Sequence, residues 1–266
     1  LLASYGYAVM TPGYGPLASG LIGHGRLPEP EEIYRNVVEM LQGTSTENDS
    51  LSGLHVLVTA GPTREAMDPV RFLSNPSSGK MGYAVAEAAA RRGATVTLVS
   101  GPTNLAPPPG VTRIDVVSAG EMYDEVVARR SADIVVMAAA VSDYAPAEAA
   151  PHKLKKTDAD LSIRLRRTSD ILAELGRQKS ASQILVGFAM ETEAHEENAR
   201  RKLESKNLDW IVLNRLDEEG SGFETDTNRV TLIHRSGNQE DLPLMSKRSV
   251  AEAILNRVAA PPLPAA

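Results

Sequence analysis

The sequence contains no cysteine, so the chain can form neither disulfide bonds nor thiolate metal sites. Nothing in this composition points to an oxidising compartment, and we expect a cytoplasmic protein. Acidic residues outnumber basic ones by 34 to 28, and a net charge of −6 lacks the broad positive field that non-specific nucleic-acid binding requires. No apolar run approaches the roughly 18 residues of a membrane span. The sequence therefore predicts no nucleic-acid partner and no membrane segment.

The two ends of the chain differ from its middle. The chain begins with leucine and shows no signal-peptide pattern, so we expect a piece cut from a larger protein. Residues 10–30 are rich in Gly and Pro and predict a loop, after which a short helix should begin at Pro30. A loop and one helix cannot form a core. A polar linker is predicted at 43–52, a full domain at 53–258 and a disordered tail at 259–266.

The middle of the chain alternates short β-branched runs with amphipathic segments. Strands are predicted at 55–60, 94–101, 113–117, 133–140, 184–190, 209–214 and 229–235, and helices at 79–93, 119–130, 169–179, 191–206 and 246–258. Right-handed crossovers between parallel strands place helices on both faces of a sheet. We therefore predict a Rossmann-like three-layer α/β fold with a mainly parallel sheet.

The stretch "SNPSSGKMG" at 74–82 is close to two glycine-rich phosphate motifs but matches neither. A P-loop needs Ser or Thr after Gly-Lys, and Met81 stands there. A dinucleotide fingerprint needs three glycines directly after a strand and a carboxylate after the next strand. Here Ser77 replaces the first glycine, the preceding strand ends near Ala60, and the second strand ends without a carboxylate. An NAD enzyme is therefore disfavoured.

The same stretch does predict an anion-binding helix start. Ser77 and Ser78 should cap a helix whose first turn carries Gly79 and Lys80, so that backbone N–H groups and the positive helix end face the loop. Ordinary helix capping is the alternative. The excursion of about 17 residues before this helix is longer than most strand–helix loops, which favours function.

Five blocks occur in order: "TAGPTREAMDPVRFLSNPSSGKMG", "AAAVSDYAP", "HKLKK", "VGFAMET" and "RRKLESKNLD". With them, residues 53–258 resemble bacterial phosphopantothenoylcysteine synthetase, the carboxyl-terminal half of a bifunctional synthetase/decarboxylase of coenzyme A biosynthesis. Residues 1–42 resemble the end of the flavin-dependent decarboxylase half. Ser19 stands where that half usually carries a catalytic cysteine, and the portion that would bind FMN is missing.

The resemblance implies a two-step ligation. The carboxylate of 4′-phosphopantothenate attacks CTP to give an acyl cytidylate and pyrophosphate, and the amine of L-cysteine then displaces CMP. Mg²⁺ is expected to enter with the triphosphate, since no His or carboxylate cluster has the spacing of a protein-only metal site. The sequence alone leaves CTP and ATP both open. Such chemistry needs charge neutralisation and positioning more than a strong base.

The resemblance also implies roles for individual residues. The implied catalytic residues are Asn75, Arg71 and Lys153. The implied nucleotide-binding residues are Ala138, Ala139, Asp143, Lys153, Asp170, Phe188, Lys202 and Lys206. The implied phosphate- or substrate-binding residues are Asn75, Ser77, Ser78 and Gly79. Each has a simpler alternative: a turn Asn, a surface Arg, tight Ala packing, a solvated cluster of Lys153, Lys155 and Lys156, or a buried strand Phe.

The sequence around three of these positions bears on their roles. Asp170 follows Thr168-Ser169, where the family has Asn-Pro, and a helix N-cap is an equally good interpretation. Lys202 and Lys206 are spaced i, i+4, so both should project from one helix face. The segment 221–233 has the family's Phe-x-x-Asp-x-Asn pattern, and turn chemistry with Asn228 in a hairpin is the one role we assign to it.

Two other function classes stay open from the sequence. One is an NAD(P)-binding oxidoreductase and the other a non-catalytic nucleotide-binding or assembly module. The resemblance also implies a homodimer in which the segment around Arg71 approaches the partner's active site, with a higher oligomer in the full-length protein.

Overall fold

The structure is a computed structural model that describes residues 9–10, 12–16, 22–28, 30, 32–34, 37, 49–156, 160–191, 195–215 and 225–259. The chain divides into two compact units, Leu1–Asp49 and Ser50–Ala266. In the first unit β1 (Gly13–Pro16) and β2 (Ile22–Arg26) form an antiparallel pair. The loop prediction for 10–30 was therefore wrong, because edge strands of a two-stranded sheet tolerate Gly and Pro. Ser19 and the tail from 260 lie outside the described residues.

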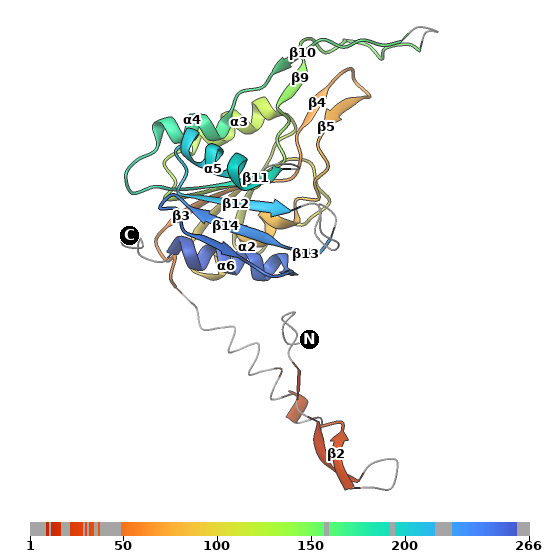
Figure 1. The fold of residues 1–266 in the computed structure, drawn as a ribbon. Coiled ribbons are helices and arrows are strands. Elements are labelled where there is room, and N and C mark those ends of the chain that lie inside the picture. The colour runs from red at the N-terminus through yellow and green to blue at the C-terminus, as the bar shows by residue number, and fades with distance from the viewer. Residues whose placement is uncertain are drawn as a thin grey trace. The chain divides into compact units, whose positions relative to one another are not determined.

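The second unit is built on an eight-stranded sheet (Figure 1). Its order is β15 (Gln239–Asp241), β14 (Val230–His234), β12 (Trp210–Arg215), β11 (Ile184–Glu191), β8 (Ile134–Met137), β3 (His55–Ala60), β6 (Thr95–Ser100) and β7 (Val111–Asp115). The six strands from β12 to β7 are parallel, while β14 and β15 add an antiparallel edge. The predicted Rossmann-like fold with a mainly parallel sheet is confirmed.

Helices cover both faces of this sheet (Figure 1). One face packs α2 (Lys80–Arg91) and α6 (Lys247–Ala259), and the other packs α3 (Ala119–Ala128), α4 (Ile171–Gln178) and α5 (His195–Ser205). Along β3, Val56 and Val58 belong to the first core and Leu57 to the second, because successive strand side chains point to opposite faces. Both faces are buried, which explains why the central strands are mostly apolar and do not alternate apolar with polar residues.

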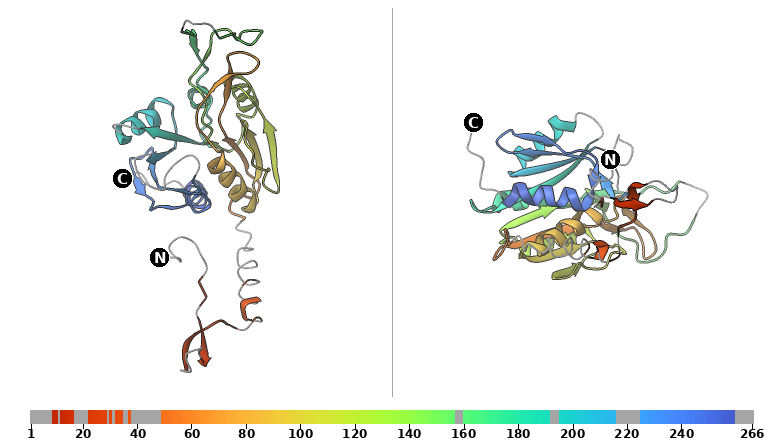
Figure 2. Two further views of the ribbon diagram at one scale, coloured as in Figure 1. Left: turned by 90° about the vertical axis from the view of Figure 1, so that its right-hand side faces the viewer. Right: turned by 90° about the horizontal axis from the view of Figure 1, so that it is seen from below.

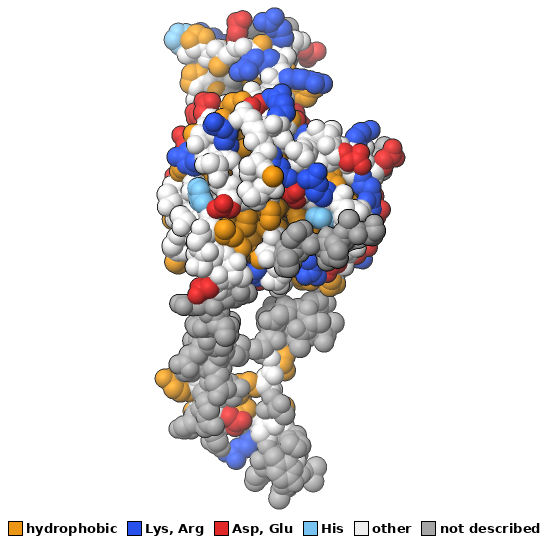
Figure 3. Space-filling model, turned by 90° about the vertical axis from the view of Figure 1, so that its left-hand side faces the viewer, with side chains coloured by type: hydrophobic (Ala, Val, Ile, Leu, Met, Phe, Trp, Pro, Cys, Tyr) orange, Lys and Arg blue, Asp and Glu red, His pale blue; other side chains and the backbone are white. Residues whose placement is uncertain are grey.

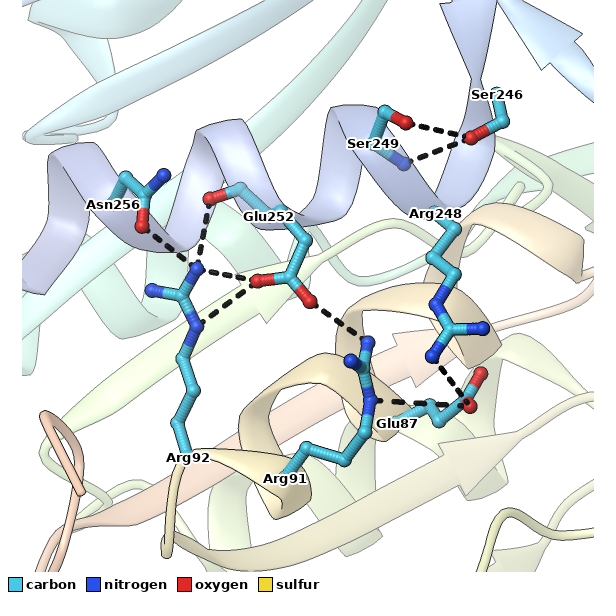
Figure 4. Close-up of polar contacts among 8 residues, drawn as sticks. All are labelled: Glu87, Arg91, Arg92, Ser246, Arg248, Ser249, Glu252 and Asn256. Carbon is cyan, nitrogen blue, oxygen red and sulfur yellow. Dashed lines mark hydrogen bonds and ion pairs between the residues drawn. The ribbon is translucent and has the colours of Figure 1, made fainter. Parts of the chain in front are cut away.

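The helices α2 and α6 lie side by side and share a polar network (Figures 2 and 4). The guanidinium of Arg92, which is 5% exposed, donates to the carboxylate and the backbone carbonyl of Glu252 and to Asn256 Oδ1 at 2.7 Å. Arg91 donates to the second carboxylate oxygen of Glu252 at 2.7 Å. These contacts hold α6 against α2, the helix that follows the glycine-rich stretch.

The strand order reverses beside β3, because the chain first adds β6 and β7 on one side of it and then places β8 on the other. Ligands of open α/β sheets bind at such a switch point, beyond the carboxyl ends of the strands. Here the loops after β3 and β8 are joined directly. Ala140 N–H donates to the Gly61 carbonyl at 2.9 Å, and Ser142 N–H donates to Thr63 Oγ1 at 3.0 Å. These hydrogen bonds fix the two loops to each other at the switch point.

Three short antiparallel pairs were not predicted. The excursion before α2 contains β4 (Arg64–Ala66) and β5 (Phe72–Ser74), and the segment after β8 contains β9 (Tyr144–Pro146) and β10 (Leu165–Arg167). Both pairs project beyond the sheet on one side (Figure 1). The third pair joins β13 (Thr227–Asn228) to β16 (Met245–Ser246). Asn228 is thus a buried strand residue and not a hairpin residue, so that expectation was wrong.

The described surface carries charges of both signs. Basic and acidic side chains are interspersed over the face drawn in Figure 3. None of the described helices combines the length and apolarity that crossing a bilayer would require.

Candidate functional site

A cleft lies at the switch point and has two adjoining lobes. The first, which we name the α2 lobe, has a volume of about 520 Å³ and is lined by residues from the start of α2 and the ends of β11 and β12. The second, named the α4 lobe, has a volume of about 420 Å³ and is lined by the start of α4 and by one face of α5. The lobes share Ala139, Val141, Asp143, Phe188 and Lys202, so they form one continuous cleft.

Most of the residues singled out in the sequence meet in this cleft. The α2 lobe is lined by Asn75, Ser77, Ser78, Gly79 and Ala138, the α4 lobe by Asp170 and Lys206, and both lobes by Ala139, Asp143, Phe188 and Lys202. They come from segments far apart in the sequence, which the parallel sheet brings to one edge. Arg71 and Lys153 line neither lobe.

The helix start beside the α2 lobe differs from the prediction. Gly79 is the N-cap residue with φ of 77°, and no side chain caps the helix. The prediction that Ser77 and Ser78 cap it was wrong, because the chain enters α2 in a left-handed conformation that favours glycine. Ser77 Oγ instead accepts a hydrogen bond from Gly79 N–H at 3.3 Å. The positive dipole end of α2 therefore faces the lobe, and among the described residues no side chain caps it.

A second glycine sets the position of this helix. A Cβ atom on Gly82 would lie 2.6 Å from Ala60 Cβ and 2.7 Å from the Thr59 carbonyl oxygen. Contacts that short do not occur between real side chains and backbone, so α2 approaches β3 as closely as it does because residue 82 has no side chain. The helix start thereby reaches the carboxyl end of β3.

Asn75 is held between the two loops of the switch point. Its Nδ2 donates to the Val141 carbonyl at 3.1 Å, and the hydroxyl of the preceding Ser74 donates to the Thr63 carbonyl at 2.7 Å. Asn75 itself is exposed to the α2 lobe. A neutral amide fixed in this way can hydrogen-bond a reacting acyl group without adding charge.

Two lysines of α5 face the cleft, as their i, i+4 spacing predicted. Lys202 Nζ donates to the Phe188 carbonyl at 2.8 Å, and Lys206 Nζ pairs with Asp170 at 2.8 Å. Phe188 is half-buried and contacts the first core as well as both lobes. The α4 lobe therefore combines the aromatic rings of Phe188 and Tyr144 with the cations Lys202, Lys206 and Arg167, a set that suits a nucleotide.

Asp170 fits both interpretations of its sequence position. Its carboxylate accepts a hydrogen bond from Ala173 N–H at 2.9 Å, so it caps α4, and it also lines the α4 lobe. Burial alone would raise the pKa of this carboxyl, but hydrogen bonds from Lys206 and Ala173 and the positive charges of Lys206 and Lys202 outweigh it, so the pKa lies below its ordinary value. The carboxylate is thus ionised and paired.

Arg71 and Lys153 lie together on the projection formed by the β4–β5 and β9–β10 pairs. The guanidinium of Arg71 binds Asp68 through Nε at 2.9 Å and Nη2 at 2.6 Å, and its Nη2 also donates to the Leu154 carbonyl at 2.8 Å. Leu154 N–H donates back to Asp68 at 3.1 Å. The hydrogen bond from Arg71 holds the pKa of Asp68 well below its usual range. One buried carboxylate therefore ties the β4–β5 turn to the segment that carries Lys153.

The projection also exposes apolar side chains. Val70, Phe72, Tyr144 and Leu165 are each 45–60% exposed. Arg64 places its guanidinium carbon 4.6 Å from the centre of the Phe72 ring. Apolar residues gathered on a projecting arm are typical of a surface that contacts another chain.

The sequence interpretation missed two polar residues of the α2 lobe, Asn214 and Lys247, and gave a third, Asn228, a turn role only. They line the lobe from β12, α6 and β13. Asn214 could have been found, because it is the one polar residue closing the apolar run 210–214 at the carboxyl end of a predicted strand. Lys247 carried no such signal.

Carboxylates are sparse around the cleft. Asp143 lines both lobes and is exposed, and Asp170 is already paired with Lys206. Within the described ranges no three His, Asp or Glu side chains gather closely enough to hold a metal ion. The lining residues fit a magnesium ion that is bound mainly by the phosphates of a nucleotide, and Asp143 is the carboxylate that could coordinate it.

Comparisons with known proteins identify the family of this chain. Residues 51–261 match the family described as DNA/pantothenate metabolism flavoprotein C-terminal domain. The chain is 49% identical over 259 residues to the coenzyme A biosynthesis bifunctional protein CoaBC of Bacillus subtilis (strain 168), which covers 96% of this chain and 63% of that protein. It thus spans less than two thirds of the length of this relative.

Solved structures give the same result. The crystal structure of the C-terminal domain of a coenzyme A biosynthesis bifunctional protein CoaBC superposes with a TM-score of 0.68 at 44% identity, covering 79% of this chain and 96% of that one. A variant of Cab2 in complex with phosphopantothenate-cysteine gives a TM-score of 0.63 at 16% identity, covering 86% and 94%, and shows the shared fold. The resemblance drawn from the motifs is confirmed, and the chain belongs to the family of DNA/pantothenate metabolism flavoprotein C-terminal domains.

Proposed function

We propose that this chain is the synthetase part of a coenzyme A biosynthesis enzyme and joins 4′-phosphopantothenate to L-cysteine at the expense of CTP. The observation that carries the proposal is the continuous cleft at the switch point, where the Asn75 loop, the α2 start and the α5 lysines converge. A relative that is 49% identical is named for coenzyme A biosynthesis, and a protein of the same fold binds phosphopantothenate-cysteine. The NAD(P) alternative is not favoured, since β6 ends at Ser100 without a carboxylate.

The proposed reaction has two displacements. A carboxylate oxygen of phosphopantothenate attacks the α-phosphorus of CTP, the bond to the β-phosphate breaks, and pyrophosphate leaves. The amine of cysteine then attacks the acyl carbon, loses a proton, and CMP leaves with the carboxylate oxygen. Mg²⁺ bound to the triphosphate would neutralise part of its charge. The protein's task is to align three reactants and to offset negative charge.

Each lobe has a part in this proposal. The α4 lobe, with Phe188, Lys202 and Lys206, would take the nucleotide, and the small side chains of Ala138 and Ala139 leave space between the lobes. The α2 lobe would take phosphate groups at the uncapped helix start. Asn75, at the junction, would hold the acyl group of the intermediate.

A homodimer would complete the site. Arg71 and Lys153 lie on the projection rather than in the cleft of their own chain, and the projection carries exposed apolar residues. We propose that this arm packs on a second copy and delivers Arg71 to the partner's cleft. Lys153 on the same arm would close over the triphosphate. In the full-length protein the decarboxylase half, with its FMN, would add further contacts, and the assignment of residues 1–42 to that half stays a prediction.

The central experiment measures pyrophosphate release by the purified chain. Phosphopantothenate and magnesium are supplied with CTP, ATP, GTP or UTP, each with and without cysteine. CTP should give sustained release with cysteine and a single burst without it, because the acyl cytidylate then stays bound. Absence of release with every nucleotide would contradict a ligase. Asn75→Asp should lower product formation by about 100-fold or more, as loss of one positioned hydrogen-bond group does; an unchanged rate would favour a non-catalytic module.

The shared-site proposal has its own test. Arg71→Ala and Asn75→Ala chains should each be inactive, and mixing them should restore about a quarter of the wild-type rate, since half of randomly formed dimers are mixed and each has one intact site. No recovery in chains shown by sedimentation to exchange would place both residues in one chain's site.

A further inference from the structure

Three polar residues of the α2 lobe have no part in the two displacements described above. Asn214 lies in β12, Asn228 lies in β13, and Lys247 begins α6. Their exposed fractions are 9%, 2% and 7%, and all three line the lobe. Three separate elements thus bring nearly buried polar side chains to one cavity.

The side-chain oxygens of the two asparagines have no hydrogen-bond donor among the described residues. Oδ1 of Asn214 and Oδ1 of Asn228 are buried, and neither receives a hydrogen bond from the residues that the structure describes. A buried polar atom without a partner is costly, so such atoms mark places where a ligand supplies the partner. Rotating a side-chain amide by half a turn exchanges its oxygen for its NH₂ group, so each Asn can also donate to a ligand.

The charge of the lobe selects an anion. Lys80, Lys202 and Lys247 line it, and among the described lining residues Asp143 is the single carboxylate. Asp226 organises two of these lysines: its carboxylate pairs with Lys80 Nζ at 2.7 Å, and its backbone carbonyl accepts from Lys247 N–H at 2.9 Å. The lining therefore has an excess of positive charge beside the positive end of the α2 dipole.

Lys247 is fixed in a manner suited to a bound anion. Its Nζ donates to the Thr225 carbonyl at 2.6 Å, and this hydrogen bond orients the ammonium group. Burial lowers the pKa of this lysine, the charge of Lys80 acts in the same direction, and Asp226 opposes both. An anion next to the ammonium group would stabilise its charged form.

We propose that Lys247, together with the amides of Asn214 and Asn228, forms a phosphoryl-binding set in the α2 lobe. The site stands on geometry and charge alone, and the identity of its occupant rests on the proposed function. Two sources of the same chemistry fit: the terminal phosphates of the nucleoside triphosphate, and the phosphate monoester of the acid substrate. Segment 225–228 positions both lysines, since Asp226 pairs with Lys80 and the Thr225 carbonyl accepts from Lys247 Nζ.

The test compares Lys247→Met with Arg248→Met by calorimetric titration. Arg248 is the next residue of α6, bears the same charge and faces Glu87 at the surface, so it is the matched control. Inorganic pyrophosphate and 4′-phosphopantothenate are titrated separately into each variant. Lys247→Met should weaken binding of at least one probe by about 10-fold or more, the effect of losing a hydrogen bond to a charged group. Arg248→Met should stay within about twofold of the wild type.

The two probes distinguish the sources. Weaker pyrophosphate binding assigns the set to the triphosphate, and weaker phosphopantothenate binding assigns it to the monoester. If Lys247→Met has the wild-type circular dichroism and binds both probes like the wild type, the proposal is overturned. Should this variant fail to fold, Asn228→Asp adds a negative charge at the same place and must weaken binding of at least one probe; unchanged or tighter binding of both probes would also overturn the proposal. Because these titrations need no turnover, they remain decisive even if the chain releases no pyrophosphate from CTP.

Discussion

The close approach of α2 to β3 at Gly82 gives a prediction that links packing to the site. In Gly82→Ala the new Cβ would meet Ala60 Cβ at 2.6 Å and the Thr59 oxygen at 2.7 Å, whereas ordinary contacts between such atoms are near 3.5 Å. The helix must therefore move away from β3 by roughly 1 Å. Overpacking of this kind against backbone costs about 3 kcal/mol, and the better helix propensity of alanine returns about 1 kcal/mol. We expect a net loss of about 2 kcal/mol in the free energy of unfolding.

The same shift should impair binding. The start of α2 would move with the helix, and a displacement near 1 Å costs up to about 100-fold in rate where geometry is tight. Gly120→Ala is the control, since Gly120 also lies in a helix but its Cβ would have Ser118 Oγ at 3.8 Å as its nearest neighbour. That variant should be stabilised by up to about 1 kcal/mol with unchanged activity. Urea unfolding and pyrophosphate release measure both; a Gly82→Ala protein as stable and active as Gly120→Ala would refute the reasoning.

Two further predictions concern stability. Glu252→Gln should lower the free energy of unfolding in urea by about 1–3 kcal/mol, because it leaves the buried Arg92 with a weaker partner. Glu87→Gln is the control: its ion pairs are exposed and 4.0 Å long, so it should cost less than about 0.5 kcal/mol. Equal costs for the two variants would contradict the network of Figure 4. Asp170→Ala should lose about 1 kcal/mol of helix capping that Asp170→Asn keeps. Since the pKa of Asp170 is lowered on folding, its ionic contribution is present above the unfolded pKa and is lost as pH falls through the folded one, so Asp170→Asn should flatten the acid limb of the stability profile.

The sheet could be predicted because its strands are buried on both faces. The apolar run 55–60 became β3 with the same bounds, and the run 184–190 became β11 with one more residue. Such runs carry their own signal, since most of their positions are apolar or β-branched regardless of the neighbouring strand. The three-residue strands β4, β5, β9 and β10 carry none, because their pairing depends on contacts such as Arg71 with Leu154, which are remote in sequence.

The site residues also fall into those that the sequence could predict and those that it could not. Residues inside ordered motifs, such as Asn75 and Lys206, could be named in advance because the motif fixes their spacing. Lys247 could not, since its place in the α2 lobe depends on how α6 docks beside α2. The helix cap was predicted wrongly for a local reason: two serines are good cap residues, but the left-handed conformation at Gly79 ends the loop one residue later.

The central claim is that the carboxylate of the acid attacks the nucleotide before cysteine reacts. Phosphopantothenate labelled with oxygen-18 in both carboxylate oxygens tests this directly in one turnover mixture with CTP, magnesium and cysteine. The account predicts that mass spectrometry finds one labelled oxygen in the phosphate of CMP, because that oxygen bridged carbon and phosphorus in the acyl cytidylate. Unlabelled CMP with labelled product would contradict the account.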